Sequence, residues 1–180
     1  LAYKHIDRFR VISDYADKFN IRFTKPGKVS EVEREYFNFV ANDGGYRFGE
    51  YMAIKEIVRY KYLLIMGGND AGTQINWALS SGSVIVMPPI RFHSTTTLGM
   101  QEWVHYVPVR RDFADLEEKM EWCTSNDDAC RTMAENAKSY AASFSPAVED
   151  EIGRQVLAFY NQSRVPSRFD RIYQSVFGSR

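Results

Sequence analysis

Hydrophobic positions follow two patterns along the chain, one typical of helices and one typical of buried strands. Tyr60–Met66 and Ser83–Met87 are short, mostly apolar runs stopped by glycines and by prolines respectively, which predicts two buried strands. Between them, Ile75–Ser81 is spaced like a helix, and Gly82 is placed to be its C-cap. The order strand, glycine-containing loop, helix and strand predicts a βαβ unit.

Further helices are predicted before this unit. Ile12–Phe19 carries an apolar stripe at helical spacing, and Ile21–Thr24 alternates like a short strand. Ser30 and Glu33 have the spacing of a capping box at the start of a second helix. A short helix is also expected within residues 50–58.

A third strand is predicted after the unit, at His105–Val109, and more helices follow it. One begins near Asp112 and Asp115, which are expected to cap it. A second begins at Asp127 or Asp128, and Pro146 is expected to end the second. Two amphipathic helices are expected in the tail. This alternation predicts an α/β fold with a parallel, Rossmann-like sheet and helices on both faces.

The loop Gly67–Gln74 is the best candidate for a binding site. Ligands of open α/β sheets bind beyond the carboxyl ends of the strands, and small residues let a ligand approach the backbone. The N–H groups at the following helix start favour phosphate. Asp70 or Thr73 is placed to cap that helix, and Thr73 is placed to donate to a phosphate oxygen. The alternative is a glycine turn with a capping Asp and no ligand, since the loop has neither the Walker nor the GxGxxG pattern.

Other reactive residues have simpler interpretations. His105 offers a ring for catalysis or stacking, or is a structural residue at the start of a strand, and His93 lies in a polar loop. The three His are scattered, so no metal site is predicted. Cys123 and Cys130 are expected to be reduced core thiols, the alternative being a pair that forms only if the helix between them breaks. No catalytic residue is identified.

Composition excludes several classes of protein. Lys and Arg total 23, as do Asp and Glu, so the net charge is zero and nucleic-acid binding is not expected. Aromatic residues reach 14%, typical of a well-packed core and of surfaces for stacking. The sequence shows no apolar run near the roughly 20 residues of a membrane span and no signal peptide, which favours the cytoplasm over a secretory lumen. The missing initiator Met suggests a processed chain or a piece of a longer one.

Several blocks, in their order and spacing, resemble glycosyltransferase family 90. This family includes capsule-associated xylosyltransferases, lipopolysaccharide-modifying enzymes and protein O-glucosyltransferases. The resemblance extends from near Glu50 to Phe144. Its blocks are Tyr51–Asp70, Trp77–Pro88, His105–Val109, Asp112–Lys119 and Ala134–Ala137.

The resemblance implies a GT-B enzyme with two Rossmann-like lobes, of which this chain supplies the C-terminal, donor-binding lobe. Residues 1–146 would form that lobe, and residues 147–180 would form amphipathic helices that cross to an N-terminal lobe, a second copy or a partner. The donor would be a nucleotide-diphosphate sugar, such as a UDP-sugar, with no further cofactor and no bound metal. The implied donor-binding residues are Gly68, Asn69, Asp70, Ala71, Gly72, Thr73, Gln74, Asn76, Pro88 and His105.

The implied reaction moves a sugar, such as xylose or glucose, to a hydroxyl of a glycan or protein with inversion, using a base from the other lobe. Gln74 and Asn76 stand where relatives often carry Arg or Lys, and Arg91 or Arg110 is placed to compensate. The alternative function is a non-catalytic module that binds a nucleotide or glycan. A third interpretation is a doubly wound domain that binds only protein partners.

Overall fold

The computed structural model describes residues 6–24, 31, 35, 48–67, 73–163 and 171. The chain divides into two compact units, Leu1–Ala142 and Ser143–Arg180. The sequence predicts a division at residue 146, four residues further on. The assignment of the two parts to a nucleotide-sugar lobe and to crossing helices stays a prediction.

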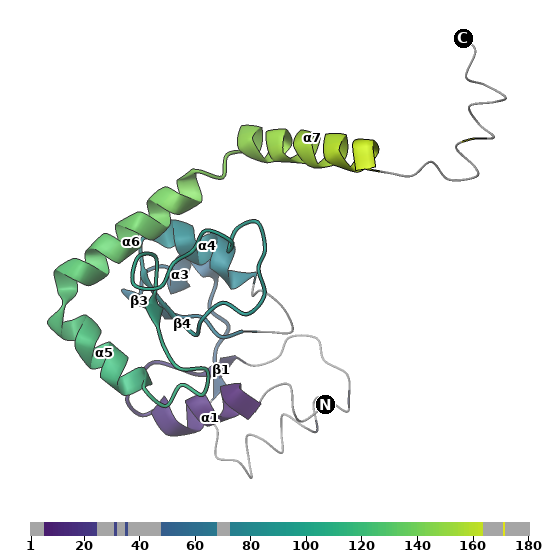
Figure 1. The fold of residues 1–180 in the computed structure, drawn as a ribbon. Coiled ribbons are helices and arrows are strands. Elements are labelled where there is room, and N and C mark those ends of the chain that lie inside the picture. The colour runs from purple at the N-terminus through teal and green to yellow at the C-terminus, as the bar shows by residue number, and fades with distance from the viewer. Residues whose placement is uncertain are drawn as a thin grey trace. The chain divides into compact units, whose positions relative to one another are not determined.

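A three-stranded parallel sheet forms the centre of the first unit (Figure 1). Its order is β3 (Tyr62–Leu64), β4 (Val84–Met87) and β5 (Val107–Pro108). Leu63 pairs with Ile85, and Val86 pairs with Val107. Helix α4 (Gln74–Ser81) connects β3 to β4, and Gly82 ends it with a φ of 78°. The predicted βαβ unit, its C-cap and the third strand are therefore confirmed.

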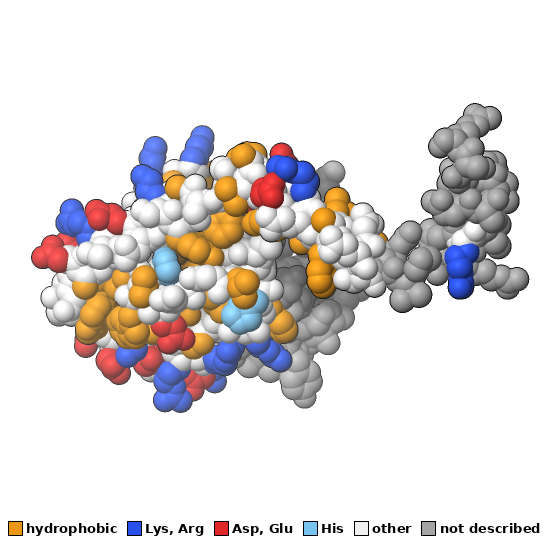
Figure 2. Space-filling model, turned by 45° about the horizontal axis from the view of Figure 1, so that its top comes forward, with side chains coloured by type: hydrophobic (Ala, Val, Ile, Leu, Met, Phe, Trp, Pro, Cys, Tyr) orange, Lys and Arg blue, Asp and Glu red, His pale blue; other side chains and the backbone are white. Residues whose placement is uncertain are grey.

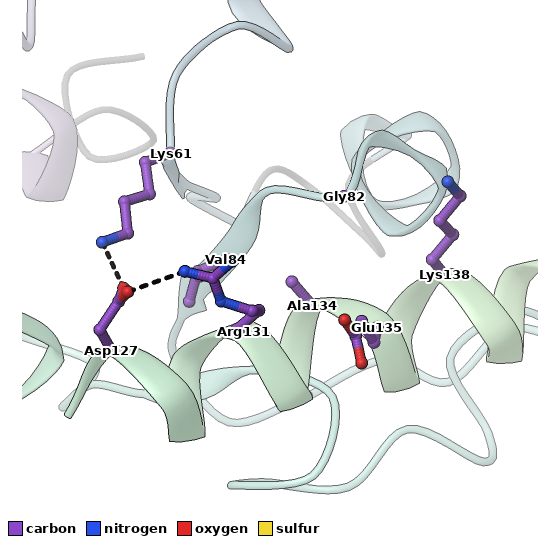
Figure 3. A pocket seen from close by; sticks show the side chains of 8 residues that line it. All are labelled: Lys61, Gly82, Val84, Asp127, Arg131, Ala134, Glu135 and Lys138. Atoms are coloured by element: carbon purple, nitrogen blue, oxygen red, sulfur yellow. Dashed lines mark hydrogen bonds and ion pairs between the residues drawn. The ribbon is translucent and has the colours of Figure 1, made fainter.

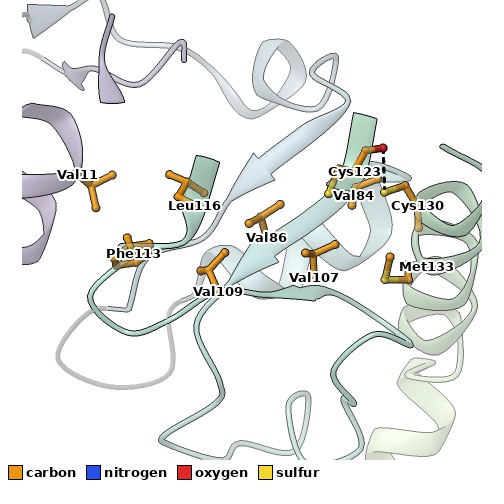
Figure 4. Packing of buried hydrophobic residues seen from close by; sticks show 11 residues of the cluster. Val11, Val84, Val86, Val107, Val109, Phe113, Leu116, Cys123, Cys130 and Met133 are labelled. Atoms are coloured by element: carbon orange, nitrogen blue, oxygen red, sulfur yellow. Dashed lines mark hydrogen bonds between the residues drawn. The ribbon is translucent and has the colours of Figure 1, made fainter. Parts of the chain in front are cut away.

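Alternate strand residues point to opposite faces of the sheet, and helices cover both faces. Val84, Val86 and Val107 lie in one buried cluster with residues of α1 (Ile6–Tyr15), α5 (Leu116–Ser125) and α6 (Asp127–Ala142), as Figure 4 shows. Ile85 and Met87 lie in the second cluster, with apolar residues of α4 and the later part of α6. The predicted α/β class, with its sheet covered on both faces, is confirmed.

The N-terminal elements differ most from the prediction. Helix α1 begins earlier than the predicted stripe and ends at Tyr15, and a turn carries the chain on to Phe19, whose N–H bonds the Tyr15 oxygen at 2.8 Å. A two-stranded parallel sheet joins β1 (Phe23–Thr24) to β2 (Phe48–Gly49), and the sequence does not predict β2. The predicted helix at Ser30 lies largely outside the described residues, and α3 (Ile54–Ile57) is shorter than expected.

The later helices follow the predicted pattern. The inward residues of α6 are buried, as predicted for Cys130, Met133, Ala134 and Ala137. Cys123 and Cys130 are both buried and free, as the interpretation as core thiols predicts. The helix between them does break, at Asn126, where α5 ends before α6 begins.

The second unit contains α7 (Pro146–Ser163), so Pro146 begins a helix as well as separating it from α6. The last predicted amphipathic helix, over residues 169–177, lies outside the described residues except for Arg171. Among the helices that the structure describes, none is long and apolar enough to cross a membrane.

Candidate functional site

The carboxyl ends of the parallel strands meet at one edge of the sheet, and the start of α4 lies at this carboxyl edge. Thr73 occupies the N-cap position of α4 and is exposed, and its side chain makes no capping hydrogen bond. The first turn of α4 holds no acidic residue. Buried Ile75 fixes this turn to the core. The helix start therefore presents positive backbone dipoles and a hydroxyl that is not used for capping.

Three more predicted donor-binding residues belong to the same edge. Gln74 and Asn76 are exposed on the first turn of α4, and Pro88 is half-buried directly after β4. The topology therefore brings Thr73, Gln74, Asn76 and Pro88 to one edge. Residues 68–72, which hold the other five predicted donor-binding residues, lie outside the described residues.

Arginines follow β4 and β5 at the carboxyl edge. Arg91 comes four residues after β4, with its guanidinium carbon 5.0 Å from the centre of the Phe92 ring. Arg110 and Arg111 come two and three residues after β5, and both are exposed. Arg110 donates twice to the Asp112 carboxylate, at 3.1 and 2.9 Å. Arg111 forms no ion pair with the described residues, which leaves it available for an anionic ligand.

Two acidic side chains organise the turn after β5. The Ala114 N–H, and then Arg110, hold the pKa of Asp112 below its usual value. Asp115 occupies the N-cap position of α5 but makes no capping bond, because it accepts the Arg110 N–H at 2.8 Å instead. The prediction that the Asp115 side chain caps α5 is therefore wrong. Both carboxylates hold the turn that presents the arginines.

His105, also predicted to bind the donor, precedes β5 and so lies at the amino edge of the sheet, opposite the start of α4. Its Nδ1 accepts the Gln101 N–H at 3.0 Å, so this nitrogen carries no proton. Its ring centre lies 5.0 Å from that of Tyr140. Burial lowers the pKa of His105. These contacts give it a structural role in the turn, and His93 is exposed in the loop after β4.

A shallow pocket of about 350 Å³ lies at the amino edge, where sequence reasoning placed no site. Lys61 and Gly82 precede β3 and β4, and they face α6 across it. Figure 3 shows Lys61 and Arg131 both reaching the Asp127 carboxylate, and their hydrogen bonds lower its pKa. No local motif indicates this pocket, because its walls are distant in sequence. Within the described part of the chain, no three His, Cys, Asp or Glu side chains are grouped as metal ligands would be.

Comparison with known families identifies the domain. The sequence profile described as Glycosyl transferase family 90 matches residues 24–145, more than half of the chain. The chain belongs to glycosyl transferase family 90. The matched range includes α4, the three-stranded sheet and the arginine-bearing turns of this family 90 domain.

Relatives of this family 90 domain include named glucosyltransferases. The chain is 35% identical over 96 residues to O-glucosyltransferase LpsA of Dichelobacter nodosus, covering 53% of the chain and 30% of LpsA. It is 24% identical over 106 residues to human Protein O-glucosyltransferase 3, covering 59% of the chain and 21% of that protein. The chain thus spans less than a third of either relative.

A solved structure is also similar. The pneumococcal O-GlcNAc transferase GtfA, in complex with UDP and GlcNAc, aligns with a TM-score of 0.47 and 15% identity, over 88% of this chain and 33% of GtfA.

Proposed function

We propose that the carboxyl edge holds the diphosphate of a nucleotide sugar, and that the chain is the donor-binding lobe of a two-lobe, GT-B glycosyltransferase. The observation that carries the proposal is the start of α4, where the Thr73 side chain makes no capping bond and no acidic residue occupies the first turn. Helix N-termini of this kind attract phosphate because their first N–H groups have no partner within the helix.

The described residues contribute to donor binding in different ways. The N–H groups at the start of α4 and the Thr73 hydroxyl donate to the phosphate oxygens, while Gln74, Asn76 and Pro88 line the rest of the donor. Arg91 and Arg111 supply positive charge from the turns after β4 and β5, and charged hydrogen bonds of this kind contribute about 1.5–3 kcal/mol each. His105 serves the fold of its own turn at the other edge.

The proposed reaction transfers a sugar to a hydroxyl group. The acceptor oxygen attacks the anomeric carbon, the bond from that carbon to the diphosphate oxygen breaks, and the nucleoside diphosphate leaves with the electron pair. A base takes the proton of the acceptor hydroxyl, and attack opposite the leaving group inverts the anomeric centre. The names of LpsA and Protein O-glucosyltransferase 3 favour glucose. Xylose is the second candidate and UDP the proposed carrier, as the family resemblance implies. The acceptor is a glycan or a protein.

A second candidate is a module that binds the nucleotide or a glycan without catalysis. The observation that favours it is the chemistry of the carboxyl edge, where Arg91, Arg110 and Arg111 cannot accept a proton and the Asp112 carboxylate is held by Arg110. The enzyme and a nucleotide-binding module share the donor site, so binding is tested before turnover.

Calorimetric titration of the chain with UDP, GDP and their glucose and xylose conjugates tests the site. Thr73→Glu is expected to abolish binding, because a carboxylate then stands where the phosphate binds. Ser80→Glu is the matched control: it places the same charge near the other end of α4, and it is expected to leave the affinity within about twofold. If Thr73→Glu and the parent bind the nucleotide with equal affinity, the nucleotide binds at another site.

A further inference from the structure

Trp103 combines a strained backbone with an exposed ring. It lies in the turn 101–106 before β5, at the amino edge of the sheet, and is 44% exposed. Its φ is 62°, in the left-handed region that L-residues rarely adopt. Among the described residues, Phe113 is the other non-glycine residue with a positive φ, but it is 2% exposed and core packing accounts for it. Burial in the core does not explain the left-handed backbone of Trp103, because its side chain is largely exposed.

The turn holds Trp103 firmly in place. The Trp103 N–H donates to the Tyr106 oxygen at 2.8 Å, and the His105 N–H donates to the Gln101 oxygen at 3.0 Å. The Gln101 N–H returns a bond to His105 Nδ1. From α6, Asn136 donates to the carbonyl oxygen of the residue after Trp103 at 3.2 Å. The indole is therefore presented by a fixed turn, and little conformational freedom remains to be lost on binding.

Aromatic and charged side chains surround the indole. The Trp103 and Trp122 rings form a T-shaped pair, with their centres 4.8 Å apart and their planes at 70°. Lys119 Nζ lies 5.8 Å from the centre of the Trp103 ring. Lys119 is itself held by Glu118 at 3.1 Å and by Asp115 at 3.9 Å. The ring is thus bordered by groups that form hydrogen bonds.

We infer that Trp103, Trp122 and Lys119 form a stacking platform for a pyranose ring of a glycan, separate from the proposed donor site. One face of a pyranose presents C–H groups, which the negative face of an indole attracts. The sugar hydroxyls around that face pair with the Lys119 ammonium and the neighbouring carboxylates. The platform binds a part of the glycan other than the reacting hydroxyl and so raises the local concentration of the acceptor.

The surroundings of the platform favour a sugar over a protein partner. Protein interfaces gather contiguous apolar patches around their aromatic anchors. The groups nearest the Trp103 ring are instead charged, namely Lys119 and its partners Glu118 and Asp115, and Figure 2 shows apolar and charged side chains side by side on one face of the molecule. Membership of a family that acts on sugars supplies the ligand class, so the inference rests on the proposed function. Asp115 links the platform to the turn after β5, because it pairs with Lys119 and accepts the Arg110 N–H.

The test uses the three indole N–H signals of the ¹⁵N-labelled full chain, one each for Trp77, Trp103 and Trp122. Cellohexaose and xylohexaose are titrated separately, with and without saturating UDP. We expect the Trp103 and Trp122 signals to shift and the Trp77 signal, from α4, to stay. Trp103→Gly is expected to weaken binding about tenfold or more while keeping the fold, since glycine adopts a positive φ without strain.

Phe92→Ala is the matched control, because Phe92 is 43% exposed and lies in the loop after β4. It is expected to bind both oligosaccharides like the parent. The inference is overturned if neither sugar shifts the Trp103 signal, if Trp103→Gly binds like the parent, or if only Phe92→Ala loses binding. It is also overturned if Trp103→Gly alters sedimentation of the sugar-free chain, which would indicate a protein contact. If the chain binds the oligosaccharides but not UDP, the proposed donor site is contradicted and the inference about the platform is unaffected.

Discussion

The two cysteines show how burial sets the chemistry of a single residue. Cys123 and Cys130 are fully buried, and Cys130 Sγ donates to the Cys123 carbonyl oxygen at 3.6 Å. Burial raises the pKa of Cys123 to about 12 and raises that of Cys130. A thiolate is therefore strongly disfavoured in the folded chain, and both thiols act as small apolar groups of the core.

This shift predicts a loss of stability in alkali. The usual thiol pKa is 9.0, so above pH 9 the unfolded chain releases thiol protons that the folded chain retains. Stability contributed by the thiols is complete below pH 9 and decreases as the pH rises towards 12. Urea unfolding under reducing conditions is expected to give a free energy of unfolding that falls between pH 9 and 10.

Replacing both thiols provides the control. Cys123→Ala with Cys130→Ala is expected to lower stability at every pH and to remove most of the slope between pH 9 and 10. Tyr106→Phe should keep most of that slope. The usual pKa of the phenol is 10.0 and burial raises it to about 12, so this group loses most of its protons above the range from pH 9 to 10. An undiminished slope in the double alanine variant would show that other groups cause it.

At the scale of elements, the sequence predicts a helix or strand well when its hydrophobic period and its terminating residue indicate the same boundaries. Helix α4 has both an apolar face and Gly82 at its end, and the sequence predicts it to within one residue. The sequence does not predict β2, because a strand of two residues is too short to show a hydrophobic period. Pro146 is interpreted from the sequence as a helix end, yet proline also suits the first position of a helix, and α7 begins with it.

Gly82 provides a test at this scale. Its φ of 78° is left-handed, and a Cβ built there would meet nothing within 4 Å, so backbone strain alone should set the cost of a substitution. Gly82→Ala is expected to lower the free energy of unfolding by about 1 kcal/mol, and Gly82→Asn by less, because Asn tolerates this conformation. Urea unfolding measures both variants. Gly153→Ala, inside α7, is the control and is expected to cause no loss. Equal costs for Ala and Asn would contradict the argument.

At the scale of the first unit, topology makes part of the site predictable. Parallel strands joined by a crossover bring their carboxyl ends together, so the order of the elements along the chain is enough to place Thr73 and Pro88 at one edge. The predicted strand His105–Val109 likewise places His105 at its amino end, and therefore at the opposite edge, whereas its assignment to the donor site comes only from the family resemblance. The left-handed backbone of Trp103 has no sequence signal, since its hydrogen bonds arise only in the folded turn.

The distribution of charge over this unit leads to a prediction about catalysis. An acceptor hydroxyl must lose its proton to a positioned base, which contributes about 10²–10⁴-fold in rate. Of the described groups near the carboxyl edge, Arg91, Arg110 and Arg111 are cations and cannot accept a proton. The carboxylate of Asp112 is held by Arg110 and the Ala114 N–H, and its lowered pKa makes it a weak base.

We therefore expect the 180-residue chain to bind UDP but to transfer sugar about 10²-fold more slowly than full-length LpsA, or slower still. Release of UDP from UDP-glucose and UDP-xylose, with glycan and peptide acceptors, measures transfer, and calorimetry verifies that the donor is bound. Asp70 is the single carboxylate of the loop 67–74 and lies outside the described residues. Turnover equal to that of LpsA would contradict the prediction, and its loss in Asp70→Asn would then identify the base within this chain.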